Sequence, residues 1–368
     1  MVGEKYLRYD EKVIYNLRTL YGAYGYLPFR MSKFEEYDLY VKNKDFLVSD
    51  SVITFNDTNG KLLALKPDVT LSIIKNGQDE KGGKQKVFYS ENVYRISGST
   101  RQFKEIMQTG LECIGDIDLY DMFEVISLAC ASLKTISNDY VVEISHLGIL
   151  NALLSSASEG EAFKSEIMEC FKQKNGHEIK KICEKHQISK EKEQLLCDFV
   201  SVYGSADKVI DKLSSFNVSA SFTSSINELK ELLALIDKTE YKDKIRLDFS
   251  IVNDMNYYNG IVFNGFINGV CETVLFGGRY DNLLNKMERS SKGIGFAVYV
   301  DLLDGLCNET REYDVDALII YDENTDTQKL IDTVNSYVSR GQSVTTQKCI
   351  PTKMRYRELI NIAGEDVK

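Results

Sequence analysis

Three segments of the chain carry polar residues whose types and spacing could bind a small polar ligand. The first is LKPDVT at 65–70, in which Pro67 fixes its own φ and restricts Lys66 to extended geometry. This would present the Asp68 carboxylate at a rigid position after a strand, where it could bind an ammonium group. An ordinary surface turn uses the same residue types, so this segment alone leaves both interpretations open.

The second segment is an expected hairpin whose strands are KVFYSENVYRI and EIMQTGLECIG, at 86–96 and 105–115. Gln108 and Glu112 are four residues apart on the second strand, so both face the same side of it. Arg95 lies just before the loop and could make a bidentate contact with a carboxylate or a phosphate. This trio suits a ligand with both donor and acceptor groups, although a solvent-facing polar stripe is the alternative.

The third signal comes from NDMNYYNGIVF and FGGRYDNLL, at 253–263 and 276–284. Paired glycines at 277–278 in a sheet would let a ligand or a backbone approach closely. Adjacent tyrosines at 257–258 would place one hydroxyl on each face of a strand. Each feature is weak alone, because glycine pairs are common in bulges and turns and tyrosine pairs are commonly half core and half surface.

The composition argues against several function classes. The 368 residues carry a net charge of −10, which disfavours broad nucleic-acid binding, and no apolar run approaches the length of a membrane span. Three His and eight scattered Cys without a CxxC pair predict no metal site, and they predict mostly buried, reduced thiols in the cytoplasm. No Walker A or GxGxxG sequence points to a cofactor, and no nucleophile–base pair stands out. We interpret His146, in an apolar context, as a satisfied core histidine.

Apolar periodicity predicts an α+β domain around an antiparallel sheet. Asn59-Gly60 between two apolar runs predicts a hairpin over 51–66. Helices are expected at 4–24 and 118–138. Besides the two hairpins, strands are expected at 244–251, 257–267 and 271–278. A strand and turn are expected over 140–150, and a short strand leading into a helix over 292–306.

Two parts of the chain differ from this pattern. Residues 152–240 are rich in Lys, Glu, Ser and Leu with helical periodicity, which predicts an all-helical insertion. The tail begins as a βαβ pattern, with a strand at 315–321, a helix at 326–339 and a short strand at 342–347. We therefore expect one domain over 1–308, interrupted at about 152–240, and a short, truncated α/β module over 309–368.

In their order and spacing, these segments together resemble the catalytic domain of the histidyl-tRNA synthetase family, which is class II. The resemblance covers roughly 5–150 and 240–306 and implies a class II synthetase-like antiparallel sheet flanked by helices. Within motif 1, Ser32 stands where the family has proline. The matching segments are 25–39 for motif 1, 65–70 for the Arg-Pro-Glu-Gly-Thr block, 93–95 with 108–112 for motif 2, 253–260 and 276–284 for the histidine-specific blocks, and 293–303 for motif 3.

The departures from the synthetase pattern are also informative. Asn253 and Leu302 stand where the synthetase has two arginines, and adenylating chemistry relies on positive charge placed where negative charge develops. The tail at 309–368 is short for an anticodon-binding domain, and its eleven acidic and eight basic residues disfavour tRNA. With Asp68 in the Pro-Asp block, the chain is similar to the regulatory subunits of short-form ATP phosphoribosyltransferase from bacterial histidine biosynthesis.

That resemblance implies a protein with no catalysis and no cofactor of its own, which dimerises through the synthetase-like face. It implies assembly with the short catalytic subunit into a hetero-octamer, activation of that subunit, and feedback inhibition by L-histidine. Two alternatives stay open: an active histidyl-tRNA synthetase, and a synthetase-like scaffold for another amino acid or a protein.

The resemblance also implies the roles of the pocket residues. The ligand's α-ammonium group would be bound by Asp68 joined by Gln108, and its carboxylate by Arg95. Glu112 and Tyr258 would address the imidazole, whose two nitrogens need donor and acceptor partners. The remaining residues that the resemblance implies for this pocket are Thr70, Tyr257 and Arg279.

Overall fold

The structure is a computed structural model that describes residues 7–43, 52–77, 82–96, 100–251, 257–306 and 312–363. The chain divides into two compact units, Tyr9–Leu306 and a second unit that comprises Met1–Arg8 and Cys307–Lys368. The expected domain boundary at 308 lies outside the described residues. Within them, no helix is long and apolar enough to cross a membrane.

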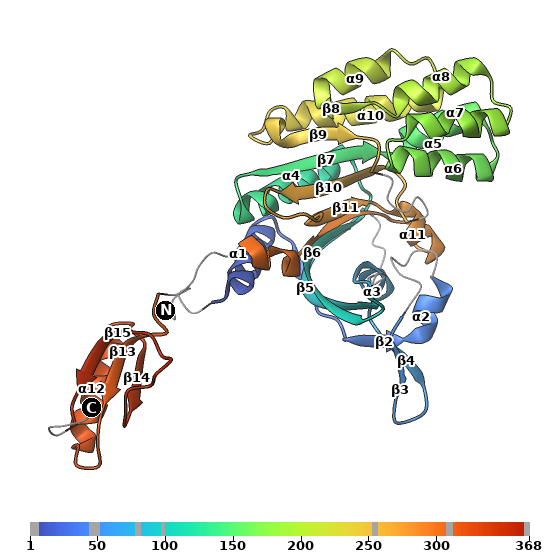
Figure 1. Ribbon diagram of the computed structural model, residues 1–368. Helices are drawn as coiled ribbons and strands as arrows, with labels where there is room; N and C mark the ends of the chain where they lie inside the picture. Colours follow the sequence, from blue (N-terminus) through green and yellow to red (C-terminus); the bar gives the residue numbers. More distant parts are fainter. Residues whose placement is uncertain are drawn as a thin grey trace. The chain divides into compact units, whose positions relative to one another are not determined.

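A nine-stranded sheet runs through the large unit in the order β1-β5-β6-β12-β11-β10-β7-β9-β8 (Figure 1). All neighbouring strands are antiparallel except the pairs β1–β5 and β7–β9, so the predicted α+β class with an antiparallel sheet is confirmed. The strands are β1 Leu27–Pro28, β5 Lys84–Ile96, β6 Phe103–Gly115, β7 Tyr140–His146, β8 Tyr203–Ser205, β9 Ile245–Asp248, β10 Ile261–Ile267, β11 Leu275–Arg279 and β12 Lys292–Tyr299.

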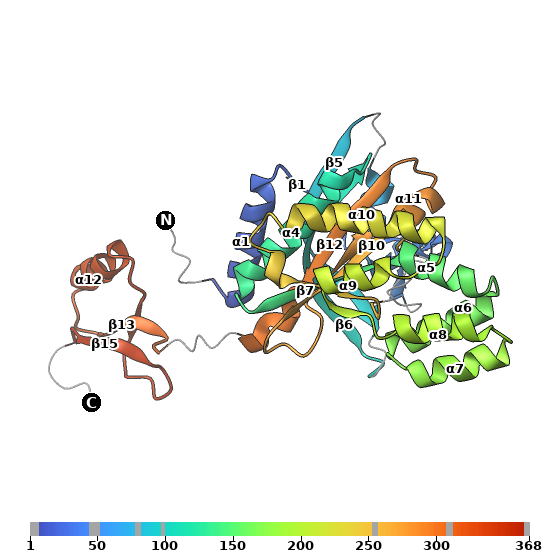
Figure 2. The same cartoon turned by 90° about the horizontal axis from the view of Figure 1, so that it is seen from above.

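Helices α1 (Tyr9–Ala23) and α4 (Leu119–Ile136) cover one face of this sheet (Figure 2). A capping box between Asp118 and Asp121 begins α4, and both of these residues also bind Lys84 at the start of β5. The apolar sides of α1 and α4 join the sheet residues in one large hydrophobic core. The opposite face of the sheet therefore remains for other elements and for the pocket.

The opposite face packs against α3 (Thr70–Asn76), α11 (Asp281–Lys286) and α2 (Tyr37–Lys42) through a second, smaller core. Next to them lies a three-stranded antiparallel sheet of β2 (Phe34–Glu36), β4 (Leu62–Leu65) and β3 (Thr54–Asn56). The predicted hairpin at Asn59-Gly60 is confirmed. Gly60 has a φ of 79°, and Asp57 Oδ1 accepts hydrogen bonds from the Asn59 and Lys61 amides.

The predicted insertion is mainly helical, but the expectation that it is all-helical is wrong at one point. Its β8 pairs with β9 and adds an edge strand to the main sheet. Three residues with a glycine at φ 135° show no apolar alternation, so periodicity could not identify this strand. The helices are α5 Leu147–Ala157, α6 Glu161–Lys172, α7 Gly176–Lys185, α8 Lys190–Phe199, α9 Ala206–Ser214 and α10 Ala220–Ile236, followed by the short 3₁₀ helix η3 at Lys242–Lys244.

The small unit contains a parallel sheet in the order β14-β13-β15 and one helix. The predicted strand, helix and strand correspond to β13 (Val315–Ile320), α12 (Thr327–Ser339) and β14 (Val344–Gln347). Sequence analysis missed β15 (Tyr356–Asn361), because YRELIN is a mostly exposed edge strand without clear alternation. In the large unit, the expected helix after β12 is the 3₁₀ helix η4, Val300–Leu306.

Glycine 277 tests how tightly the helix-covered face of the sheet is packed. A Cβ at Gly277 would lie 2.5 Å from the Phe263 ring and 2.6 Å from Phe296 Cβ. We expect Gly277→Ala to lower the free energy of unfolding by about 1–3 kcal/mol in urea titrations. Gly22→Ala in α1 meets nothing within 4 Å and should leave stability unchanged or raise it by up to about 1 kcal/mol. Equal effects of the two substitutions would contradict this packing.

Candidate functional site

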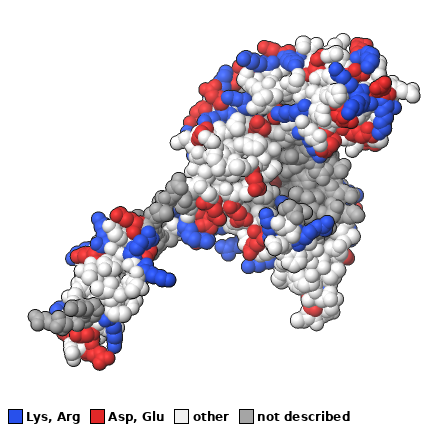
Figure 3. All heavy atoms as spheres, in the orientation of Figure 1, with Lys and Arg blue, Asp and Glu red and all other residues white. Residues whose placement is uncertain are grey.

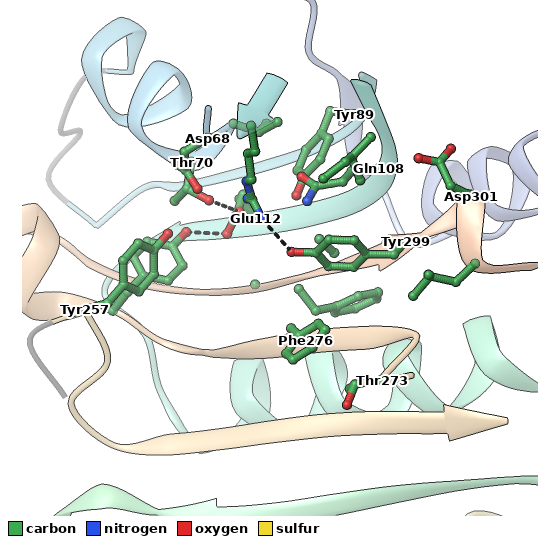
Figure 4. A pocket seen from close by; sticks show the side chains of 18 of the residues that line it. Asp68, Thr70, Tyr89, Gln108, Glu112, Tyr257, Thr273, Phe276, Tyr299 and Asp301 are labelled. Carbon is green, nitrogen blue, oxygen red and sulfur yellow. Dashed lines mark hydrogen bonds between the residues drawn. The ribbon is translucent and has the colours of Figure 1, made fainter. Parts of the chain in front are cut away.

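A cavity of about 610 Å³ opens over the face of the sheet opposite α1 and α4, between β5, β6, β11, β12 and the segments that lead into α3 and β10 (Figure 4). The structure brings seven of the eight predicted ligand residues together in its wall. They are Asp68, Thr70, Arg95, Gln108, Glu112, Tyr257 and Tyr258. Gln108 and Glu112 face the same side of β6, as their spacing predicted.

The carboxylate of Glu112 lies at the centre of this wall and is only 2% exposed. Its Oε1 accepts a hydrogen bond from Thr70 Oγ1 at 2.7 Å, and its Oε2 accepts one from the Tyr280 hydroxyl at 2.5 Å. Burial disfavours the charged form and raises the pKa of Glu112 to about 8, although the two hydroxyl donors act in the opposite direction. Glu112 is therefore largely protonated near neutral pH.

The Asp68 carboxylate lies at the start of α3. Its Oδ1 accepts a hydrogen bond from the Leu71 amide at 2.9 Å, which satisfies a free N–H group of the first helical turn. Burial raises the pKa of Asp68 above its ordinary value, while the Leu71 amide and Arg95 oppose that rise. Asp68 thus both begins the helix that carries Thr70 and presents a carboxylate to the pocket.

Arg95 holds the segment before Asp68 against the sheet. Its Nε donates to the Pro67 carbonyl at 3.0 Å, and its Nη1 donates to the Tyr299 hydroxyl at 3.3 Å. The fully buried Lys66, which directly precedes Pro67, forms an ion pair with Glu91 at 2.6 Å. Two side chains of β5 therefore fix this segment, which agrees with the rigid geometry predicted at Pro67.

Aromatic rings form the pocket wall opposite α3. The rings of Tyr257 and Tyr258 are 4.6 Å apart, and the Tyr280 ring lies 6.1 Å from that of Tyr257. The expectation that the two adjacent tyrosines point to opposite faces of a strand is wrong, because both precede β10 and line the same cavity. The predicted close approach at the paired glycines is confirmed: a Cβ at Gly278 would lie 2.7 Å from the Tyr258 ring.

Arg279 is the predicted ligand residue that does not line the cavity. Its Nε donates to Asp281 Oδ2 at 2.8 Å, and its Nη1 lies 3.5 Å from Glu228 Oε1. Asn253 lies outside the described residues, whereas Leu302 lines the pocket. His146 is buried, as predicted for a core histidine, and its Nε2 lies 3.6 Å from Glu228 Oε2, but neither ring nitrogen makes a hydrogen bond within the described residues.

Sequence analysis missed two residues that shape the centre of the site. Tyr280 follows directly after Arg279, and its hydroxyl, not the preceding guanidinium, reaches Glu112. Gly295 lies opposite Glu112 on β12, and a Cβ there would meet Glu112 Oε2 at 1.9 Å. The GIGF pattern at 293–296 was the available signal, because a glycine inside a strand often marks a close approach.

The lining carries an excess of negative charge. Among the described residues it includes five acidic side chains against two basic ones, Arg95 and Lys104; the acidic set is Asp68, Glu105, Glu112, Glu272 and Asp301. The described residues hold no cluster of three or more His, Cys, Asp or Glu arranged for a metal ion. The cavity is therefore suited to a small ligand with cationic groups and one anionic group that can reach Arg95.

This fold and this pocket define a class II synthetase-like protein, and comparisons with known proteins identify the family. The histidyl-tRNA synthetase family model matches residues 2–303, so the chain belongs to that family. A crystal structure of an ATP phosphoribosyltransferase regulatory subunit/histidyl-tRNA synthetase from Bacillus halodurans is 23% identical to this chain, with a TM-score of 0.81. The match covers 96% of this chain and 94% of the Bacillus halodurans chain. Histidyl-tRNA synthetase from Nostoc is 18% identical with a TM-score of 0.75, covering 94% and 83%.

Similar curated proteins carry a more specific name. ATP phosphoribosyltransferase regulatory subunits from Oceanobacillus iheyensis and Caldanaerobacter subterraneus are 27% and 29% identical. The first alignment covers 79% of this chain and 72% of the relative, and the second covers 77% and 75%. A chain of the ATP phosphoribosyl transferase (HisG:HisZ) complex from Thermotoga maritima is 20% identical with a TM-score of 0.62, covering 79% and 97%.

The raised pKa of Glu112 predicts a particular pH dependence of stability. The folded chain holds this proton more tightly than the unfolded chain, whose ordinary carboxyl pKa is 4.5. The contribution is therefore complete below about pH 4.5 and is lost as the pH rises to about 8, with a slope of at most about 1.4 kcal/mol per pH unit. Glu112→Gln, which stays neutral, should lack this component.

The measurement is the free energy of urea unfolding for wild type and Glu112→Gln, in steps from about pH 5 to about pH 9. The wild-type value minus the variant value should fall with rising pH and level off above about pH 8. A difference that rises with pH would show that folding favours the ionised form of Glu112.

Proposed function

We propose that this chain is the non-catalytic regulatory subunit of a short-form ATP phosphoribosyltransferase in the first step of histidine biosynthesis. In this role it activates the catalytic subunit in the cytoplasm and mediates feedback inhibition by histidine. The observation that carries the proposal is the pocket: the residues matched to the amino-acid site converge there, while Leu302 occupies the position of an ATP-binding arginine. The curated relatives named regulatory subunits support the same function.

The charge of the pocket argues against amino-acid activation by this chain. A triphosphate and its pentavalent transition state need cations where the negative charge develops. The lining offers Arg95 and Lys104 against five carboxyl groups, with the apolar Leu302 beside Asp301.

L-Histidine matches the polar groups of the pocket. Its α-ammonium group would meet Asp68 and Gln108, and its carboxylate would meet Arg95, whose five N–H donors exceed the two used in protein contacts. An imidazole N–H would donate to Glu112, and an imidazolium would favour the ionised form of this buried carboxyl. Tyr258 would cover the ring, with Tyr257 and Thr70 behind it.

We propose homodimerisation through the sheet β2–β4–β3 and β1. Exposed apolar side chains lie on these strands, namely Leu27, Phe34, Phe55 and Leu62. Charged groups of both signs are interspersed over the insertion helices, whereas the tip formed by β3 and β4 shows few of them (Figure 3). Such an apolar area on a folded chain favours association, and the dimers would then join the catalytic subunits in a hetero-octamer.

Histidine binding tests the pocket directly. Calorimetric titration with L-histidine should show that Glu112→Gln binds at least about tenfold more weakly than wild type, because a charge-assisted hydrogen bond is lost. Glu272→Gln makes the same side-chain substitution at the exposed rim of the cavity and should stay within about threefold of wild type. Unchanged affinity in Glu112→Gln would overturn the pocket assignment.

Assembly with the catalytic partner tests the function. Co-expressed with the short ATP phosphoribosyltransferase catalytic subunit of the same genome, the chain should co-purify with it and raise its turnover. Histidine should inhibit the complex, and the chain alone should show no histidine-dependent ATP–pyrophosphate exchange. Clear exchange activity together with no co-purification would support a synthetase instead.

A further inference from the structure

The predicted ligand residue Arg279 occupies the centre of a polar network behind the pocket wall. Its side chain is 17% exposed, and it contacts Asp281 at 2.8 Å and Glu228 at 3.5 Å. The Asp281 side chain in turn accepts hydrogen bonds from the Gly293 amide at 3.1 Å and from Asn259 Nδ2 at 3.2 Å. Through Asp281 and Glu228, Arg279 therefore links β12, the segment before β10 and helix α10 without lining the cavity.

This network fixes the segment that carries the pocket tyrosines. The Asn259 amide donates to the Arg279 carbonyl at 3.0 Å, and Asn259 Oδ1 accepts from the Asp281 amide at 2.7 Å. Gly260 has no side chain, and a Cβ there would lie 3.3 Å from Arg279 Cδ, so the arginine stem lies directly on this segment. Tyr258 is the residue immediately before Asn259, so its position depends on these contacts.

The same network also fixes the hydroxyl that holds Glu112. Tyr280 lies between Arg279 and Asp281 in the chain, and its hydroxyl donates to Glu112 Oε2. Movement of the Arg279–Asp281 pair would therefore shift Tyr280 and the Tyr257–Tyr258 segment together. The Tyr257–Tyr258 segment and Tyr280, which line the predicted imidazole end of the pocket, are therefore both positioned by the Arg279–Asp281 pair.

The outer end of the network belongs to the helical insertion. Glu228 lies on α10, which packs on α5 and α4 through Ile226, Leu229 and Leu233. The Gly260 carbonyl accepts a hydrogen bond at 2.8 Å from the amide of Leu147, the first residue of α5. Two helices of the insertion thus contact the segment and the arginine that position the pocket tyrosines.

We propose that Arg279 is a positioning residue, and that its ion pair with Glu228 makes ligand affinity depend on the position of the helical insertion. This inference rests on the proposed histidine pocket. It adds the contacts through which ligand binding in that pocket would change the position of the insertion. A ligand that draws Tyr258 and Tyr280 inward moves the Arg279–Asp281 pair. Because Arg279 also pairs with Glu228, this movement shifts the contact on which α10 rests. By reciprocity, a partner that moves α10 changes the affinity of the pocket.

The test is calorimetric titration of the full chain with L-histidine, below the melting temperature of every variant. Arg279→Met, which keeps a long stem without the charge, should weaken binding about tenfold or more, and Arg279→Lys should restore part of it. Glu228→Gln should weaken binding about threefold to tenfold, and combining it with Arg279→Met should add nothing further. Glu231→Gln, an exposed carboxylate on the same helix, should bind as wild type does.

The outcomes separate this inference from the histidine pocket itself. If wild type does not bind histidine, the pocket assignment and this inference both fail. If wild type binds, and folded Arg279→Lys, Arg279→Met and Glu228→Gln bind equally well, only this inference is overturned. Lower melting temperatures with unchanged affinity would show a purely structural role for Arg279 and would overturn it too. Additive effects in the double variant would exclude the Glu228–Arg279 route.

Discussion

The Glu112 carboxyl group lies almost without solvent contact in the pocket wall, and the neighbouring elements are arranged around it. A buried carboxyl group needs hydrogen-bond partners, which Thr70 supplies from the first residue of α3 and Tyr280 from the residue before α11. It also needs space, and the β6–β12 register places Gly295 directly opposite. A helix start, a loop end and a strand glycine are thus linked through one acidic group.

The same buried group explains how the fold tolerates an acidic pocket. Five carboxyl groups in one wall would repel one another if all were ionised, and a proton on Glu112 removes the most deeply buried charge. A ligand with a cationic ring can replace that proton, whereas a polyanion would add to the repulsion. The burial that favours a proton on Glu112 therefore also disfavours a polyanion in this pocket.

The sequence predicted those parts of the site that depend on short-range geometry. Period-two spacing placed Gln108 and Glu112 on one face, and Pro67 indicated the rigid turn that presents Asp68. It could not decide between Arg279 and Tyr280, because only the path of the chain after β11 determines which side chain reaches Glu112. The edge strands β8 and β15 were missed for a related reason, since their stability comes from pairing with β9 and β13 and not from apolar alternation.

The regulatory role proposed for this pocket requires more than binding, because a ligand shifts a conformational equilibrium only if it binds two states unequally. The wall of this pocket comes from segments that are far apart in sequence and are tied down outside the cavity. Arg95 holds the segment before Asp68, Asp301 of η4 accepts the Met107 amide of β6, and Arg279 holds the tyrosine segment. A ligand that contacts the Asp68 segment, β6 and the tyrosine segment can favour one arrangement of these three segments over another. Unequal binding to two states therefore requires no large opening of the fold. The Arg279 tie differs from the other two because it continues, through Glu228, into the helical insertion.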